Sequence, residues 1–239
     1  MIFGILLCDT LADVLPPEQT PYDELFRKLI LSVRPDARFR VYDVRSFVGP
    51  ADPAECDAYI VTGSLSAAYD EEPWIRFCVK KMRDLHAAGA VLVGVCFGHQ
   101  LIAQAFGGRV ERSPKGWCVG VHTYARRDQT RAGGQGNPIT LLHSHQDIVT
   151  ELPDGADVIA GDDFCVNAAY RIGDTVISFQ GHPEFTVRTA EYMLDCAVYQ
   201  GLTTEATRRA YASLSTTTNH VEIAEQICAF VEARASDRA

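Results

Sequence analysis

The segment 90–106 constrains the fold most, because an apolar run gives way there to a helical pattern through a cysteine flanked by glycines. Ala90–Val95 is rich in β-forming residues and is typical of a buried strand. Cys96 follows directly, between Gly94 and Gly98. In a turn of this kind the small residues let backbone and substrate approach closely, and the central side chain stands at a helix N-terminus, where the peptide dipoles favour a thiolate. The segment predicts that Cys96 is presented as a nucleophile; a buried structural cysteine in the same turn is the alternative.

A second β-like run, Ile177–Gln180, is followed by a histidine with a carboxylate two residues further on. Residues two apart on an extended chain point to the same side, so Glu184 can hold the imidazole ring of His182 and stabilise its charged form. Pro183 stiffens the link, because it fixes its own φ and restricts the residue before it. His182 and Glu184 would supply the base and the orienting group that a nucleophilic Cys96 requires.

Strand-like and helical patterns alternate through the first half of the chain. The strand-like runs are Ile2–Leu7, Arg38–Val44, Ala58–Thr62 and Ala90–Val95, and the helical patterns cover about Tyr22–Ser32 and Trp74–Ala88. This alternation predicts right-handed crossovers and a parallel sheet covered by helices on both faces. Ligands bind beyond the carboxyl ends of the strands in such sheets. Gly63, Cys96 and His182 each follow a predicted strand, so we expect them at one edge of the sheet.

Shorter β runs separated by turns follow the helix after Cys96. They are Trp117–Tyr124, Pro138–Leu142, Asp157–Gly161, Cys165–Arg171 and Thr175–Gln180. From Val187 the pattern is helical again, and Asn219 with Glu222 resembles a capping box that opens a last helix, whose apolar face we expect on the core. The glycine-rich segment 133–137 lacks the lysine and the hydroxyl residue of a phosphate-binding loop, so we interpret it as a plain loop.

The predicted fold class is α/β, with a central, mostly parallel sheet flanked by helices, a smaller antiparallel β portion and a helical C-terminal tail. A chain of 239 residues with 47% apolar residues can bury a sizeable core. The sequence contains no internal repeat and no clear interdomain linker. We therefore expect a single domain over residues 1–239, with a helical C-terminal extension from about 187 to 239.

Charge and cysteine usage exclude several classes of function. The net charge of −9 disfavours nonspecific binding to nucleic acid or to anionic membranes. The eight cysteines are scattered without a C-x-x-C pair, which predicts neither a zinc knuckle nor a disulfide framework. No signal peptide is visible before Asp9, and no apolar run approaches the ~20 residues of a membrane helix. We expect a reducing, cytoplasmic compartment.

Three histidines could suggest a metal site: His99, His143 and His145. They are not accompanied by carboxylates at a spacing that would converge on an ion. We therefore expect no metal and no other cofactor.

Cys96–Gln100 together with Gly181–Glu184 resembles the class I (triad) glutamine amidotransferase family. Three further segments resemble that family in the same order along the chain. They are Thr62–Ser64 for the oxyanion strand, Gly107–Val110 with Gly116 for the segment after the nucleophile helix, and His143–Asp147 with Leu152 and Pro153 for the glutamine pocket. The likeness extends over roughly residues 58–185 and implies a flavodoxin-like sheet.

Within the family, Ser144–Asp147 and the run Tyr69–Trp74 look most like the free-standing relatives of the GMP synthetase amidotransferase domain, a group that includes the γ-glutamyl peptidases. The sequence shows no ATP-binding P-loop and no second catalytic domain. We expect a small-molecule substrate, glutamine or another γ-glutamyl compound. The chain would either hydrolyse it alone or pass ammonia to a separate synthetase subunit.

The resemblance implies thiol-dependent hydrolysis of the γ-glutamyl amide of glutamine. Cys96 would attack the carbonyl to form a γ-glutamyl thioester, His182 would accept and then deliver the proton, and Glu184 would orient His182. Backbone N–H groups at three positions would stabilise the oxyanion: Gly63, Ser64 and Phe97. The implied substrate-binding residues are Gln100, Ser144, His145 and Gln146.

Two of these residues carry open questions. The structural alternative for Gln100 is an amide that satisfies the backbone of the turn. Gln146 stands where many relatives have a glycine, which affects the expected shape of the pocket and leaves the chemistry unchanged.

Three other functions compete with a glutaminase. A stand-alone γ-glutamyl peptide hydrolase would use the same residues, and a noncatalytic regulatory subunit could keep the same fold. Hydrolases of the α/β-hydrolase type place nucleophile, acid and histidine in that chain order. Here Glu184 follows His182, which favours the amidotransferase interpretation over that last alternative.

Overall fold

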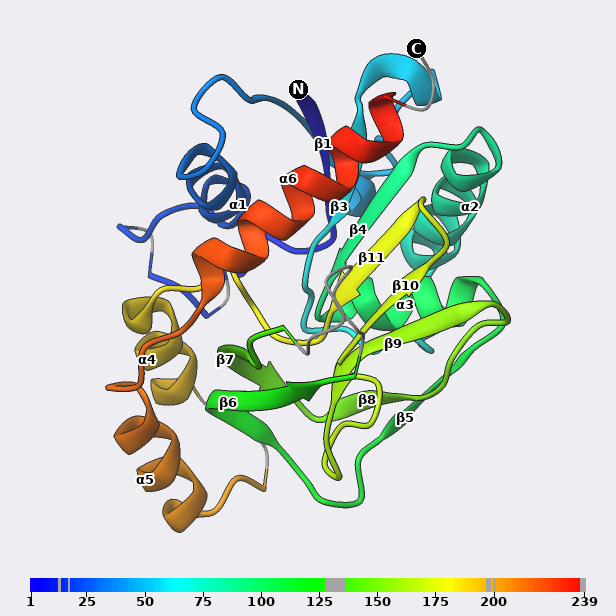
Figure 1. Cartoon of the computed structure of the whole chain (residues 1–239). Coiled ribbons are helices and arrows are strands. Elements are labelled where there is room, and N and C mark those ends of the chain that lie inside the picture. Colours follow the sequence, from blue (N-terminus) through cyan, green and yellow to red (C-terminus); the bar gives the residue numbers. More distant parts are fainter. Residues whose placement is uncertain (13, 17, 128–135, 197–198, 200, 237–239) are drawn as a thin grey trace.

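Strands and helices alternate through the first half of the chain, as the sequence predicts, in the computed structural model (Figure 1). The structure describes residues 1–239 except 13, 17, 128–135, 197–198, 200 and 237–239. The elements are β1 (Ile2–Leu7), α1 (Tyr22–Leu31), β2 (Arg38–Asp43), β3 (Ala58–Val61), α2 (Pro73–Ala87), β4 (Val91–Val95) and α3 (Phe97–Ala105), with 3-10 turns at Val44–Ser46 and Pro53–Glu55. β1 pairs in parallel with β2 and β3, and β3 pairs in parallel with β4.

The second half adds mostly antiparallel strands and three helices. They are β5 (Arg109–Arg112), β6 (Cys118–Arg126), β7 (Ile139–His145), β8 (Asp147–Glu151), β9 (Ala156–Gly161), β10 (Ala169–Ile172), β11 (Val176–Phe179), α4 (Val187–Asp195), α5 (Thr204–Ser213) and α6 (His220–Ser236). Within the described part of the chain, the main sheet has nine strands in the order β2-β1-β3-β4-β11-β10-β9-β6-β7. β11 returns parallel to β4, and β10, β9, β6 and β7 continue the sheet antiparallel. The predicted α/β fold class is confirmed.

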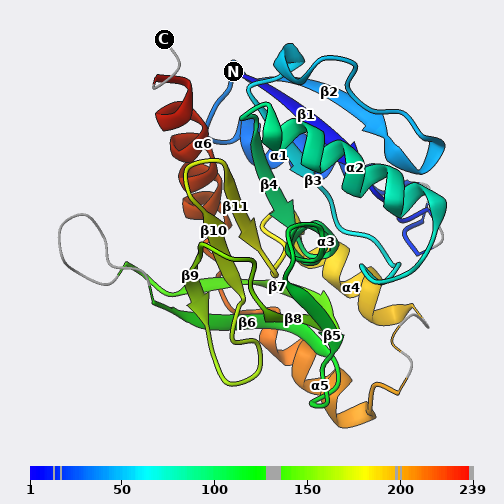
Figure 2. The same cartoon turned by 90° about the vertical axis from the view of Figure 1, so that its right-hand side faces the viewer.

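Helices cover both faces of the parallel part of the sheet. β4 has apolar side chains on both faces, and the helices bury them. Val91, Val93 and Val95 pack in the core that α1 and α6 cover. Leu92 packs in the core that α2 and α3 cover. Figure 2 shows α6 on one side of β4 and β11 and α2 on the other. A strand that is buried on both faces reads as a continuous apolar run, which is why β4 was recognisable in the sequence.

The last helix packs on the core, as expected. Ile223, Ile227 and Val231 of α6 are buried, and the helix contacts α1, β4 and β7. Asn219 precedes the helix, but its side chain accepts a hydrogen bond from the Thr140 N–H of β7 at 2.8 Å. The residue before α6 thus ties the helix to the sheet. No helix among the described residues is both long and apolar enough to cross a bilayer.

The structure differs from the sequence prediction in three places. β5 and β8 form a two-stranded ribbon that the sequence did not predict, because each is short and the alternation of β5 is weak. β7 continues to His145, where the prediction ended at Leu142. β10 begins at Ala169 rather than Cys165, because the side chain of Asp162 accepts hydrogen bonds from two backbone N–H groups in a turn that ends at Cys165. The predicted loop at 133–137 lies largely outside the described residues.

Candidate active site

Cys96 occupies the turn between β4 and α3 in a strained conformation. Its φ is 52° and its ψ −106°, a region that residues with a side chain rarely adopt. A side chain at Gly94 would come within 2.8 Å of Ile102 Cδ1, and one at Gly98 would collide with the carbonyl oxygen of Val61. Both flanking glycines are therefore required by close packing. This confirms the predicted strand–turn–helix unit at Cys96.

Pairing of β4 with β11 brings the two predicted motifs together. The strands run parallel with Val95 beside Phe179, and the Cys96 N–H donates to the Phe179 carbonyl at 2.9 Å. His182 follows three residues later and donates its own N–H to the Leu142 carbonyl of β7 at 2.8 Å. The cysteine and the histidine therefore lie at the same end of neighbouring strands, as expected.

His182 is held on two sides. Its Nδ1 lies 2.7 Å from Glu184 Oε1, and both side chains are buried. The Phe185 ring stacks on the imidazole with 3.9 Å between ring centroids and 8° between the planes. The hydrogen bond to Glu184 and the stacking fix both the position and the tilt of the ring.

The electrostatics of His182 depend on its two neighbours. Burial alone would lower the pKa of His182, but the negative charges of Cys96 and Glu184, and hydrogen bonds to both, raise it to about 10. The side chains of Cys96, His182 and Glu184 are thus brought within interaction range of one another. The raised pKa favours the imidazolium form of His182 in this arrangement.

Tyr22 is a member of this site that sequence reasoning missed. Its hydroxyl donates to Glu184 Oε1 at 3.1 Å and accepts the Gly63 N–H at 3.0 Å. Burial raises the pKa of Tyr22 well above its usual value, and the charge of Glu184 adds to this. Tyr22 is 162 positions from Glu184, and the only sequence signal was its place at the start of a predicted helix.

Asp9 holds the loop after β3 and was also missed. Its Oδ2 accepts from Ser64 Oγ and from the Leu65 N–H, each at 3.1 Å. The same carboxylate accepts the Leu11 N–H at 2.9 Å. A buried carboxylate that accepts several hydrogen bonds fixes the course of a loop that has no strand partner of its own.

Gly63 has a different place from the predicted one. Its N–H is donated to Tyr22, so it is not directed at the pocket. A side chain at Gly63 would collide with the Tyr22 hydroxyl and lie 3.2 Å from His182 Cε1. In this structure the Gly63 N–H is bonded to Tyr22, and the glycine makes room for Tyr22 and His182.

A pocket of about 430 Å³ opens in front of Cys96. Five residues predicted at the site line it together with Cys96: Ser64, Gln100, Ser144, His145 and Gln146. Other lining residues were not predicted as site residues, among them Trp117, Met193 and Tyr199. The Tyr199 hydroxyl lies 2.7 Å from Ser144 Oγ, so the segment after α4 closes one wall. Met193 and Tyr199 had no motif around them in the sequence.

Gln100, which lines the pocket, also makes hydrogen bonds within the protein. Gln100 Nε2 donates to the Asp147 carbonyl at 2.8 Å and to Gln180 Oε1 at 3.1 Å. Gln100 thus lines the pocket and satisfies backbone at the same time. His99 is a core residue, since it is fully buried. Its Nδ1 lies 2.9 Å from Ser178 Oγ.

The model of a known protein family, Glutamine amidotransferase class-I, matches residues 40–198. The chain belongs to the class-I glutamine amidotransferase family. Among curated relatives, γ-glutamyl peptidase 2 of Arabidopsis thaliana is 32% identical over 151 residues, which is 62% of this chain and 60% of that protein. A GMP synthase of Porphyromonas gingivalis is 32% identical over 137 residues, 56% of this chain and 26% of that protein. The chain thus spans about three fifths of the peptidase and a quarter of the synthase.

A solved glutamine amidotransferase shares the fold over nearly the whole chain. The crystal structure of a glutamine amidotransferase from Thermotoga maritima superposes with a TM-score of 0.71 and covers 98% of this chain and 96% of that one. The sequences are 16% identical, so this likeness concerns the fold.

Replacing Glu184 should lower the pKa of His182. Glu184→Gln keeps the shape of the side chain but removes a charge that favours the imidazolium, so burial then dominates and the pKa falls from about 10. NMR titration of the His182 ring measures the change. Glu111→Gln, an exposed carboxylate on β5, is the control and should leave the titration unchanged. An unaltered His182 titration in Glu184→Gln would contradict the assigned pair.

Cys96 should react first among the eight thiols. It lines the pocket at a helix N-terminus beside His182, whereas burial raises the pKa of Cys118 to about 12 and also raises that of the partly exposed Cys196. Iodoacetamide at less than one equivalent, followed by peptide mapping, identifies the labelled residue. Preferential labelling of Cys196 would mean that exposure rather than local activation decides reactivity.

Proposed function

We propose that the protein hydrolyses γ-glutamyl amides, with glutamine among its substrates, through a thioester on Cys96. The observation that carries this proposal is the buried His182–Glu184 pair, 2.7 Å apart, behind a strained cysteine that lines an open pocket. Strain of this kind persists where function requires it. A noncatalytic subunit would have no use for it.

In the proposed reaction the Cys96 sulfur attacks the δ-carbonyl carbon and forms a C–S bond. His182 holds the thiol proton and delivers it to the leaving nitrogen as the C–N bond breaks, which releases ammonia or an amine. Water then attacks the thioester, and His182 takes its proton and returns it to the sulfur. Free glutamate or a γ-carboxylate product leaves, and the thiol is restored.

The tetrahedral oxyanion would be stabilised by the backbone N–H groups of Ser64 and Phe97. Ser64 lies in the loop that Asp9 holds, and Phe97 is the first residue of α3, where the N–H groups point out of the helix. The Gly63 N–H is not available, because Tyr22 accepts it. Gln100, Ser144, His145 and Gln146 would contact the γ-glutamyl portion from the pocket floor.

The relatives favour two versions of this function. The γ-glutamyl peptidase relative supports hydrolysis of γ-glutamyl peptides by the chain alone. The GMP synthase relative supports delivery of ammonia to a synthetase partner. We favour the first, because the pocket of about 430 Å³ extends from Cys96 to the side chains of Tyr69 and Arg112 and leaves room for an amine larger than ammonia.

A substrate comparison with the purified chain separates these versions. We expect release of glutamate from glutamine and of amino acids from γ-glutamyl dipeptides, followed by chromatography of the products. If the chain cleaves neither substrate but gains glutaminase activity on addition of a cell extract, the stand-alone version is wrong and a partner synthetase is required.

Removal of the nucleophile or the base should abolish turnover. Cys96→Ala and His182→Ala should each lower kcat/KM by roughly 10³-fold or more, and Glu184→Gln should have a smaller effect, because an orienting group contributes less than the base it holds. Cys228→Ala, another buried cysteine, is the matched control and should keep full activity. Wild-type activity in Cys96→Ala would refute the proposed chemistry.

Tyr22→Phe should lower kcat about tenfold and leave KM nearly unchanged, because a positioning residue acts on the triad rather than on substrate binding. The variant loses the hydrogen bonds to Glu184 and Gly63 but keeps the ring. Tyr59→Phe, which loses a hydroxyl bonded to the Pro53 carbonyl at 3.1 Å, is the control for stability. Equal melting temperatures with a fall in kcat only for Tyr22→Phe would support the role; a rise in KM alone would contradict it.

A further inference from the structure

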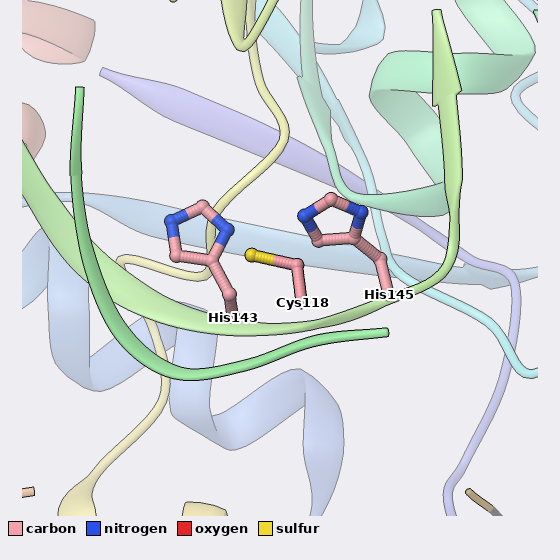
Figure 3. Close-up of side chains that lie close together, drawn as sticks. All are labelled: Cys118, His143 and His145. Carbon is pink, nitrogen blue, oxygen red and sulfur yellow. The ribbon is translucent and has the colours of Figure 1, made fainter. Parts of the chain in front are cut away.

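Three side chains with metal-binding donor atoms lie together beside the pocket, and the proposed reaction uses only one of them, His145, as a substrate contact. They are Cys118 on β6 and His143 and His145 on β7, and their donor atoms all lie within 4.8 Å of one another. Figure 3 shows the sulfur of Cys118 between the two imidazole rings, with a ring nitrogen of each turned toward it.

The sheet register produces this cluster. Cys118 is directly opposite His145 in the antiparallel pair of β6 and β7. His143 is two residues before His145, so both rings project to the same side of β7. The cluster therefore sits on two paired strands, which makes its geometry as rigid as the sheet.

The two histidines carry buried nitrogens without hydrogen-bond partners. His143 is 3% exposed, and neither of its ring nitrogens has a partner among the described residues. His145 is 4% exposed, and its Nε2 has none either within the described part of the chain. Buried polar groups are rarely left unsatisfied in folded proteins, so these nitrogens require an explanation. A metal ion at the centre of the cluster would bind one nitrogen of each ring and so account for two of these three nitrogens.

Surrounding contacts orient the donors as in a metal site. His145 Nδ1 lies 3.0 Å from the Asp147 carbonyl oxygen, which places the proton on Nδ1 and leaves the lone pair of Nε2 for a ligand. The Tyr124 hydroxyl lies 3.7 Å from the Cys118 sulfur and can donate to a thiolate there. An imidazole fixed by a backbone carbonyl is the usual arrangement for a metal-binding histidine.

We propose that Cys118, His143 and His145 bind one Zn²⁺ ion. A thiolate with two imidazoles suits zinc, which takes four ligands in tetrahedral geometry. Donors on one zinc ion lie roughly 3.5 Å apart, so the cluster, now within 4.8 Å, needs to close by roughly 1 Å. The Cys118 thiol gives its proton to solvent as the Zn–S bond forms, and water takes the fourth position.

The position of His145 determines how an ion could reach the cluster and what it would affect, because His145 also lines the pocket in front of Cys96. An ion can enter through that pocket. Once bound, it joins β6 to β7, which carries Ser144 and ends next to Gln146. The sequence-based expectation of no metal rested on the lack of carboxylates near the histidines and of paired cysteine spacing; Cys118 is 25 positions before His143 and is brought there by strand pairing.

The test uses the full-length Cys96→Ala chain, in which the pocket thiol cannot bind the ion. We expect one equivalent of Zn²⁺ to remain after dialysis, measured by elemental analysis, and a higher melting temperature than for the metal-free chain. Substitution with Co²⁺ should give thiolate-to-cobalt charge-transfer absorption with the visible bands of a tetrahedral site. No retained ion and no rise in melting temperature would overturn the proposal.

Two double variants locate the ion. Cys96→Ala with Cys118→Ser should lose the charge-transfer band and bind Zn²⁺ at least tenfold more weakly, whereas Cys96→Ala with Cys228→Ser, which changes another buried thiol, should keep both. Undiminished binding in the Cys118→Ser variant would place the ion elsewhere and overturn the proposal. Because retention and melting temperature are measured on Cys96→Ala itself, the proposal remains testable if the Cys118→Ser variant does not fold.

Discussion

The parallel pairing of β4 with β11 is the constraint on which the site depends. It places Val95 beside Phe179, so the chain leaves both strands at the same edge of the sheet. The cysteine turn and the histidine segment are distant in sequence, and no local interaction could align them. The hydrogen bond from the Cys96 N–H to the Phe179 carbonyl, at 2.9 Å, joins the two directly. Every proposed role of these residues assumes this register.

Tyr22 connects three parts of the structure that the sheet alone does not hold together. Its hydroxyl is hydrogen-bonded to Glu184 and to the backbone of Gly63. Because Tyr22 is the first residue of α1, these bonds also attach α1 to the site. Buried hydrogen-bond networks of this kind restrict the arrangement of the groups that they join. The carboxylate that orients His182 is thereby coupled to the loop that Asp9 shapes. Glu184 and the loop after β3 are therefore held by one connected set of hydrogen bonds.

The sequence predicted the parts of the fold that follow from patterns of neighbouring residues. The apolar run of β4, the glycines around Cys96 and the spacing of His182 and Glu184 are each visible within a few residues. Tyr22, Asp9 and the ribbon of β5 and β8 were missed, because their positions follow from tertiary pairing and carry no local signal. The cluster of Cys118 with His143 and His145 was missed for the same reason: it exists only in the register of β6 and β7.

The backbone conformation of Cys96 costs stability at a position where the proposed function requires a thiol. A φ of 52° with ψ −106° is disfavoured for any residue with a Cβ, and a glycine would adopt it freely. Glycine at position 96 would relieve this strain, and the resulting chain would lack a nucleophile. Random substitution therefore tends toward a more stable, inert copy of the fold. A cysteine held in this disfavoured backbone conformation is what the proposed nucleophilic role of its thiol would require.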